Sequence, residues 1–218
     1  MKLKIDLHVH TVYSGDSSIT LEKAIVAAKK AGLDGFAITD HDNVEMNKKI
    51  LGKNFDLIII PGVEVTSRDG HILGLGVLEP IKPNLSAFET VKKIHELGGL
   101  AIAPHPLNPF KHSLNKDVVE KIGVDAVETA NASMPHVLQF KIEELAEKLN
   151  VAKTGGSDAH IPSSIGKAYT VIEVEEKSLE SILKAIKDKK TTPLKKETSI
   201  NEFFPKIWLK IKRKIKEL

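Results

Sequence analysis

The sequence of 218 residues contains no cysteine. This absence excludes a disulfide scaffold, a cysteine-ligated zinc site, an iron–sulfur cluster and a thiol nucleophile, so any metal ion must be held by His, Asp or Glu. Long apolar runs are missing as well: none reaches the roughly 18 residues of a membrane span, and the N-terminus lacks the apolar core of a signal peptide. We therefore expect a soluble, cytoplasmic protein with no transmembrane segment.

Arginine is scarce, with Arg68 and Arg213 the only two, and aromatic residues make up 5% of the chain. The hydrophobic fraction of 41% and the charged fraction of 28% are typical of a globular protein. The net charge of +3 is unevenly distributed, since residues 206–218 carry six basic side chains and one glutamate, which leaves −2 for the rest. The main body is therefore not the basic surface that long nucleic acids select.

This charge distribution predicts a main domain at residues 1–194 and a basic amphipathic tail at residues 195–218. We expect the apolar face of the tail to pack on the main domain or on a second subunit, and contact with nucleic acid or a membrane surface is the alternative. That face is formed by Phe204, Ile207, Trp208, Ile211, Ile215 and Leu218, with Lys and Arg opposite.

Short β-branched runs alternate with longer amphipathic ones, which is the pattern of repeated βα units. Continuous apolar runs such as residues 57–60 indicate strands buried on both faces, as in a parallel sheet. Because only about seven units fit before the tail, we expect an α/β fold with a distorted (βα)7 barrel, smaller than the usual one. Strands are predicted at 3–9, 35–39, 56–65, 71–77, 100–104, 124–129, 151–156 and 169–174, and helices at 20–31, 43–52, 84–97, 115–122, 136–149 and 178–188.

Histidines and carboxylates gather at the ends of these predicted strands. His8 and His10 end the first strand, and Asp158 and His160 follow the seventh; at a spacing of two, the side chains of each pair point to the same side. Active sites of α/β barrels form at the carboxyl ends of parallel strands, where the loops converge. Five further residues lie near such ends: Asp16, His41, Glu64, His71 and His105.

Six histidines and three carboxylates on one edge predict a metal site, because they would be an electrostatically unusual group without cations among them. Neutral imidazole and carboxylate suit Zn²⁺, Mn²⁺ or Fe, and nine ligands fit two or three ions rather than one. A single histidine at a strand end is more often a hydrogen-bonded or solvated residue, but the set as a whole favours metal binding. His95, His112 and His136 are interpreted as surface, capping or loop residues instead.

The ordered motifs resemble those of the PHP (polymerase and histidinol phosphatase) family over about residues 5–175. They are Asp-Leu-His8-Val-His10-Thr, Thr39-Asp40-His41, Gly62-Val-Glu64, His71, Pro104-His105-Pro106 and Gly156-Ser-Asp158-Ala-His160. The resemblance implies a distorted seven-stranded barrel, a trinuclear metal centre and phosphoesterase activity. Some family members have His where Asp16 stands, and a carboxylate there shifts the preference from Zn²⁺ towards Mn²⁺ or Fe.

The resemblance also implies which ligands share an ion. His8, His10, Glu64 and Asp158 would hold the first ion. Glu64 would bridge to a second ion held with His71 and His105. Asp16, His41 and His160 would hold the third. Asp40 is not implied as a ligand, and Asp6 is interpreted as a strand or supporting residue.

The chemistry we expect is in-line hydrolysis of a phosphate ester by a hydroxide that bridges the first two ions, because metal binding lowers the pKa of water. Asp158 and His160 are the candidates for catalytic proton transfer. The sequence has neither a Gly-x-Ser-x-Gly motif nor a Gly-x-x-x-x-Gly-Lys-Ser/Thr loop. Candidates for substrate binding are Arg68, Lys111 and Asn131; a surface position is as good an interpretation of Arg68 as a phosphate clamp.

The sequence therefore favours a metal-dependent phosphoesterase that acts on a small-molecule or nucleotidic phosphate, including a short oligonucleotide. Two alternatives stay open: an amidohydrolase-like hydrolase of a non-phosphorylated substrate, and a non-catalytic PHP-type binding module. The complete ligand set argues against the binding module, because a degenerate site should have lost ligands.

Overall fold

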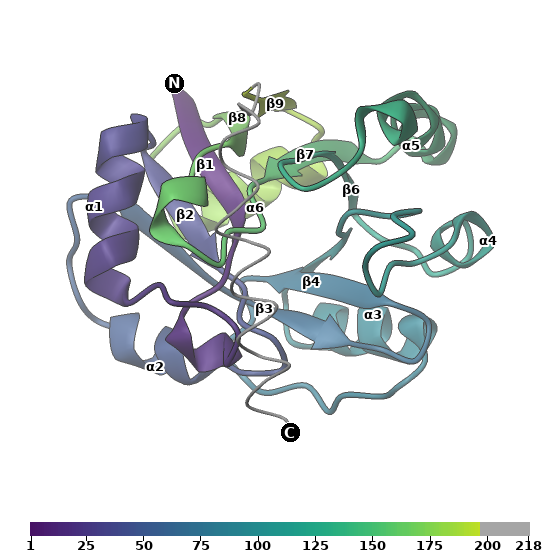
Figure 1. The fold of residues 1–218 in the computed structure, drawn as a ribbon, viewed down its shortest axis with the longest axis horizontal. Helices are drawn as coiled ribbons and strands as arrows, with labels where there is room; N and C mark the ends of the chain where they lie inside the picture. Colours follow the sequence, from purple (N-terminus) through teal and green to yellow (C-terminus); the bar gives the residue numbers. More distant parts are fainter. Residues whose placement is uncertain (197–218) are drawn as a thin grey trace.

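The computed structural model describes residues 1–196, except for the side chain of His136. In this part of the chain, strands form one sheet in the order β7-β6-β5-β4-β3-β2-β1-β8-β9, with helices on its outside (Figure 1). The strands are β1 (Lys2–Val9), β2 (Gly35–Ile38), β3 (Ile58–Thr66), β4 (His71–Leu75), β5 (Leu100–Ala103), β6 (Ala126–Asn131), β7 (Ala152–Gly156), β8 (Ala168–Glu173) and β9 (Thr191–Lys195).

The helices follow most of the predicted amphipathic segments. Helix α1 starts at an N-cap, Thr20, whose side chain accepts the backbone N–H of Lys23, and α3 starts with a capping box between Ser86 and Glu89. The α-helices are α1 (Leu21–Ala31), α2 (Glu45–Ile50), α3 (Ala87–Glu96), α4 (Lys116–Val119), α5 (His136–Leu149) and α6 (Leu179–Lys187), and the 3₁₀ helices are η1 (Val12–Ser14) and η2 (Pro162–Ser164).

The sheet is mixed, so the predicted (βα)7 repeat is only partly present. Strands β1, β2 and β3 are parallel, as are β5, β6 and β7, but β4 lies antiparallel between β3 and β5. Strand β8 is antiparallel to β1. The turn between Thr66 and His71 is too short for a crossover helix, so β3 and β4 can only pair as a hairpin.

The sheet closes almost completely into a barrel because β7 approaches β1 and β8. The backbone N–H of Gly155 donates to Thr170 Oγ1 at 2.8 Å, and that of Asp158 donates to the carbonyl of His8 at 2.8 Å. Gly156 permits this approach: a Cβ there would lie 2.4 Å from the Cβ of His8. The glycine pair at 155–156 therefore lets the two ends of the sheet meet.

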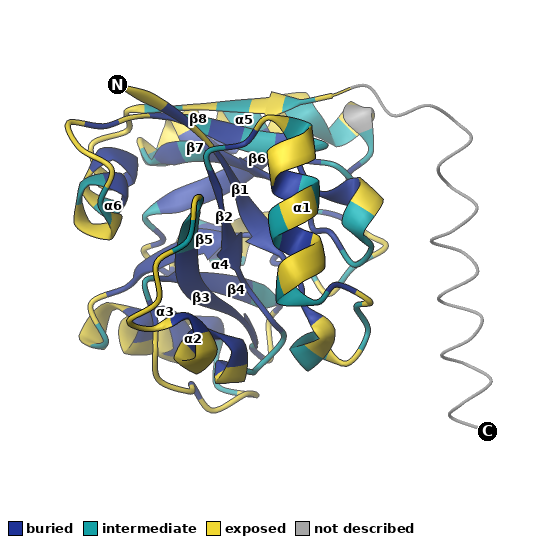
Figure 2. Cartoon of the chain, turned by 90° about the vertical axis from the view of Figure 1, so that its left-hand side faces the viewer, coloured by how far each residue is buried: buried dark blue, intermediate teal, exposed yellow. Residues whose placement is uncertain are grey.

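The barrel interior is apolar at the end where the parallel strands begin. Leu3, Ile5 and Ile60 pack there with Ile182 and Ile186 of α6, so α6 closes this end. Helices α1 and α2 cover β1 and β2 from outside, and α3 and α5 cover β4 to β7. Figure 2 shows the same pattern, with buried strands inside and helices exposed on their outer faces. The opposite end of the barrel carries the polar strand ends.

The end of the described chain differs from the sequence expectation. Residues 191–195 form β9, which pairs only with β8 and leaves Thr192 and Leu194 exposed. Pro193 fits there because an edge strand needs fewer backbone donors. The predicted tail at 195–218 lies outside the described residues from position 197 onward. Within the described part, none of the helices has the length and apolar character required to cross a bilayer.

Candidate metal centre

All nine predicted ligands meet at the open end of the barrel. Strand β1 delivers His8 and His10, and its register against β2 shifts between Asp6 and Val9, as in the bulges that re-aim side chains near active sites. His71 reaches the same edge because β4 runs antiparallel and starts opposite Thr66, the last residue of β3. The remaining ligands follow β2, β5 and β7 or lie on β3, with Asp16 just after η1.

Glu64 lies at the centre of the cluster and is 1% exposed. Its Oε2 atom lies 3.2 Å from His8 Nε2, 3.1 Å from His10 Nε2 and 3.3 Å from His41 Nδ1. Its Oε1 atom lies 3.1 Å from His71 Nδ1 and 3.2 Å from His105 Nε2. Burial alone would raise the pKa of Glu64, but the surrounding imidazoles hold it well below its usual value. One ionised carboxylate thus faces five histidines from four strand ends.

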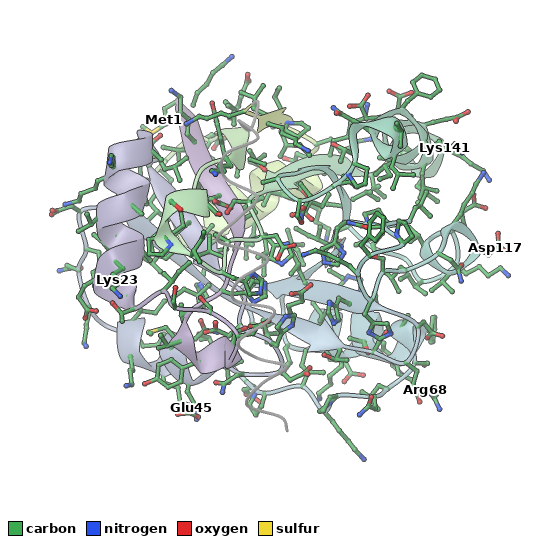
Figure 3. The ribbon with its side chains drawn as sticks, in the orientation of Figure 1. Met1, Lys23, Glu45, Arg68, Asp117 and Lys141 are labelled. Carbon is green, nitrogen blue, oxygen red and sulfur yellow. The ribbon has the colours of Figure 1, made fainter. Side chains whose placement is uncertain are left out.

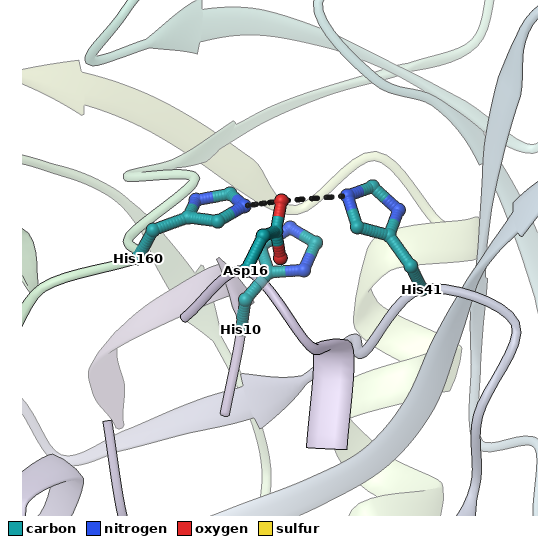
Figure 4. A group of neighbouring side chains, drawn as sticks. All are labelled: His10, Asp16, His41 and His160. Atoms are coloured by element: carbon teal, nitrogen blue, oxygen red, sulfur yellow. Dashed lines mark ion pairs between the residues drawn. The ribbon is translucent and has the colours of Figure 1, made fainter. Parts of the chain in front are cut away.

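A second group contains His10, Asp16, His41 and His160 (Figure 4). Asp16 Oδ2 lies 3.3 Å from His160 Nε2 and 3.9 Å from His41 Nε2. Burial would raise the pKa of Asp16, but these two histidines and His10 lower it below its ordinary value. The group therefore contains an ionised carboxylate with three imidazoles around it.

Asp158 joins the cluster from the loop after β7. Its Oδ1 lies 3.7 Å from His8 Nε2 and 3.5 Å from His10 Nε2, and its backbone has a φ of 53°, which is unusual for a residue other than glycine. Its second oxygen contacts Lys111 Nζ and lies 3.2 Å from Ser133 Oγ. The carboxylate thus lies between the histidines of β1 and the ammonium group of Lys111 at the mouth of the site.

Within the described residues, four groups have ligand atoms close enough to share an ion. They are His10–Asp16–His41–His160, His8–Glu64–His105, His8–His10–Asp158 and His41–Glu64–His71. Together these groups contain the nine predicted ligands and nothing else.

The geometry of the donors fits metal binding. His8 Nε2 lies 3.0 Å from His10 Nε2, and both rings are fully buried. Two imidazole nitrogens this close must share a proton or coordinate a common cation. His41 Nδ1 is also buried and makes no hydrogen bond with the described residues, although it lies 3.3 Å from Glu64 Oε2. A divalent cation would satisfy these nitrogens and the carboxylates together.

The protonation of the histidines supports the same conclusion. Burial lowers the pKa of His41 to about 3 and that of His105 and His160 to about 4, so these rings are neutral at pH 7 and can bind metal. Burial would lower the pKa of His8 too. The negative charges of Glu64 and Glu128 outweigh the effect of burial and raise the pKa of His8 to about 9. A cation bound between these groups would displace that proton, because metal ligands bind in the deprotonated form.

Hydrogen bonds from the outer nitrogens fix the orientation of the ligand rings. His8 Nδ1 lies 3.1 Å from Glu128 Oε1, His10 Nδ1 lies 2.8 Å from Ser14 Oγ, and His105 Nδ1 lies 3.0 Å from Ser113 Oγ. Such partners set the tautomer that leaves the inner nitrogen available to a metal. The sequence did not identify Glu128, Ser14 or Ser113 as partners of these rings, because nothing local in the sequence links them to a histidine.

Glu128 is the strongest of these supports, and its removal should weaken metal binding. Its Oε2 also accepts the backbone N–H of His105 and the Nδ2–H of Asn131, both at 2.8 Å. Glu128→Gln would place an NH₂ group against one of these donors, so we expect metal affinity to fall by about 10- to 100-fold. Competition with a chelating dye measures the affinity. Glu173→Gln, on the exposed side of β8, is the control; equal affinity in both variants would contradict this role.

Two buried aspartates outside the ligand set hold the loops that carry ligands. Asp40 accepts both the backbone N–H and the hydroxyl of Thr11, directly after His10. Asp6 accepts the backbone N–H groups of Ser157 and Gly166, each at 2.8 Å. Asp6 therefore ties β1 to the segment that contains Asp158 and His160.

The structure separates the three predicted substrate-binding residues. Lys111 reaches the cluster through Asp158. Asn131 is fully buried: its Nδ2–H donates to Glu128 and its Oδ1 accepts the backbone N–H of Ser133. Arg68 points outward at the margin of the molecule (Figure 3), where its 65% exposed side chain pairs with Glu89 at 3.7 Å. The short β3–β4 turn places Arg68 on the outside, between Glu64 and His71 in the chain, and its role as a phosphate clamp stays a prediction.

Known proteins resemble this chain in sequence and fold. Residues 139–191 match the PHP-associated family. An uncharacterized protein of Methanocaldococcus jannaschii is 39% identical over 142 residues, which cover 60% of this chain and 82% of the relative. A "probable phosphatase" of Proteus mirabilis is 26% identical over 209 residues, which cover 78% and 84%.

A solved structure shows the same fold. It is a two-domain protein of Bacteroides vulgatus that contains a predicted PHP-like metal-dependent phosphoesterase. The TM-score is 0.68 at 18% identity, and the alignment covers 90% of this chain and 65% of that one. The family match, the relatives and the fold agree, and the chain therefore belongs to the PHP (polymerase and histidinol phosphatase) family.

Proposed function

We propose that this protein is a phosphoesterase that hydrolyses a small-molecule or nucleotidic phosphate ester with the help of two to three divalent transition-metal ions, Zn, Mn or Fe. The observation that carries the proposal is the position of Glu64, whose two carboxylate oxygens face five imidazoles within 3.3 Å. A carboxylate with histidines on both oxygens can bridge two cations, which is the arrangement of binuclear hydrolases.

The four ligand groups support a division of the nine ligands among three ions. We assign His8, His10, Glu64 and Asp158 to the first ion, and Glu64, His71 and His105 to the second. Asp16, His41 and His160 would hold the third; His10 also lies within reach of that group. Bound ions would lower the pKa of a water nucleophile and neutralise charge on the phosphoryl oxygens.

The protein groups around the ions supply positioning and proton transfer. His160 is about a quarter exposed and holds its Nδ1 3.0 Å from the backbone carbonyl of Asp158, so its Nε2 faces the site. We assign proton exchange with the leaving group to Asp158 through Oδ2, which faces Lys111 and Ser133 rather than the histidines, and to His160 when its Nε2 does not hold the third ion. Lys111 brings an ammonium group to the mouth of the cluster, where it would bind a phosphoryl oxygen.

The test is hydrolysis of an aryl phosphate by protein stripped of metal and reloaded with Mn²⁺, Zn²⁺ or Fe²⁺, with elemental analysis of the bound ions. We expect turnover only after reloading, with two to three ions per chain and a second loss of activity on chelation. His95→Ala is the matched control for the procedure, because the side chain of this surface histidine pairs with Asp125 at 2.7 Å rather than with a predicted ligand.

Fully loaded protein that hydrolyses no phosphate ester would contradict the proposal. A panel of amides and lactones then separates the alternatives. Turnover there would indicate an amidohydrolase-like enzyme, and metal binding without any turnover would indicate a binding module.

A further inference from the structure

Helix α5 carries an apolar patch on its outer surface. Val137 is 81% exposed and Phe140 is 76% exposed, and their spacing of three places both side chains on the same face of the helix. The opposite face of α5 already packs in the core through Ile142 and Leu145. The helix therefore has a second apolar surface, formed by Val137 and Phe140, that the described residues leave open to water.

The described chain ends next to the start of α5. Lys195, the last residue of β9, donates a hydrogen bond of 2.8 Å from its ammonium group to the backbone carbonyl of Met134. Met134 directly precedes Pro135, the N-cap of α5. Figure 1 shows β9 and α5 on the same side of the barrel. The residues that follow β9 in the chain therefore start close to the patch on α5.

The sequence after β9 is long enough to reach this patch. Residues 196–203 separate β9 from Phe204, the first residue of the predicted apolar face of the tail. An extended chain covers roughly 3.3 Å per residue, so this linker spans up to about 25 Å. Phe140 lies about 6 Å along the axis of α5 from the first residue of the helix, because the rise is about 1.5 Å per residue. The linker can therefore bring the tail onto α5.

We propose that the apolar face of the tail, within residues 204–218, packs against Val137 and Phe140 of the same chain. Each apolar surface would remove the other from water, which is the main favourable contribution to association. The linker favours the chain's own tail over the tail of a second copy, because a short tether gives an effective concentration on the order of millimolar. The basic side chains of the tail would then face solvent. This inference does not depend on the proposed function.

The experiment uses the fluorescence of Trp208, the single tryptophan of the sequence, which lies on the predicted apolar face of the tail. In the full chain we expect blue-shifted emission and weak quenching by acrylamide. Phe140→Glu should lower the ratio of docked to free tail by at least about tenfold, because the apolar contact is lost and a charge would be buried. Phe140→Leu should keep the indole shielded. The matched control is Phe88→Glu on α3, where the phenylalanine is 60% exposed.

Equal quenching of Trp208 in the unaltered protein, Phe140→Glu and Phe88→Glu would overturn the inference, whether the indole is exposed or shielded. Circular dichroism checks that each variant is folded, and Val137→Asp repeats the test at the other residue of the patch. Shielding that does not change on dilution supports docking within one chain. Shielding that is lost on dilution, with a dimer in sedimentation, assigns the patch to a second copy and overturns the inference. An indole that is shielded only by phosphatidylglycerol vesicles overturns it in favour of a membrane surface.

Discussion

Glu64→Gln should reduce kcat/KM for a phosphate ester by at least about a thousandfold, because metal ions stabilise transition-state charge by several kcal/mol and each 1.36 kcal/mol is tenfold in rate. The amide keeps the shape of the side chain but removes the charge. It also replaces one oxygen with an NH₂ group that cannot coordinate a cation. Both oxygens of Glu64 face imidazoles, so either orientation of the amide disrupts one side of the cluster. Initial rates at saturating Mn²⁺ measure the effect.

Elemental analysis of the same variant tests the cause of the loss. We expect Glu64→Gln to bind fewer ions than the unaltered protein while its circular dichroism stays unchanged. The control is Glu144→Gln, an exposed glutamate on α5, which should retain rate and metal content. Full metal content with full activity in Glu64→Gln would show that this carboxylate bridges nothing.

Replacement of Asp6 should change how stability depends on pH. Burial raises the pKa of Asp6 from 3.8 to about 6, even though backbone N–H groups of Ser157, Gly166 and His8 donate to it. The folded state therefore binds a proton more tightly than the unfolded state does, and ionisation of Asp6 destabilises the fold as pH rises from about 4 to about 6. A difference of about two pKa units corresponds to about 3 kcal/mol in total.

Asp6→Asn removes this titration. The unfolding free energy of the unaltered protein minus that of the variant should fall by about 2 kcal/mol between about pH 4.5 and about pH 7. Urea denaturation of metal-stripped protein at several pH values measures it, and other ionisable groups cancel in the difference. Asp56→Asn is the control: Lys29 lowers the pKa of this exposed carboxyl, so both folded and unfolded states are ionised above about pH 4.5 and the difference should stay nearly constant. If the difference in unfolding free energy between the unaltered protein and Asp6→Asn did not depend on pH, the pKa of Asp6 would not be raised in the folded state.

Much of the secondary structure follows from local patterns. Thr20, Ser86 and Ser178 cap α1, α3 and α6, and each side chain accepts a hydrogen bond from a backbone N–H, although the helix predicted from residue 84 begins only after Ser86. The eight predicted strands are present with boundaries that shift by a few residues. The pattern could not reveal β9, because an edge strand with alternating exposure and a proline resembles an irregular linker.

Local sequence patterns did not predict whether a strand runs parallel or antiparallel to its neighbours. A continuous apolar run indicates burial on both faces, and β4 is buried on both faces while running antiparallel. The short turn at residues 67–70 was the available signal for a hairpin. The same antiparallel direction explains why His71, at a strand start, lies beside ligands from strand ends.

The sequence by itself determined which histidines and carboxylates gather at one edge of the sheet, because His-x-His and Asp-x-His spacings place side chains on one side of an extended chain. It also excluded thiol chemistry through the absence of cysteine. Only the tertiary structure decided that Glu64 faces five imidazoles, that Glu128 and two serines orient the rings, and that Lys111 reaches the site while Arg68 does not. These outcomes depend on contacts between residues far apart in the chain, and barrel closure through Gly155 and Gly156 sets those distances.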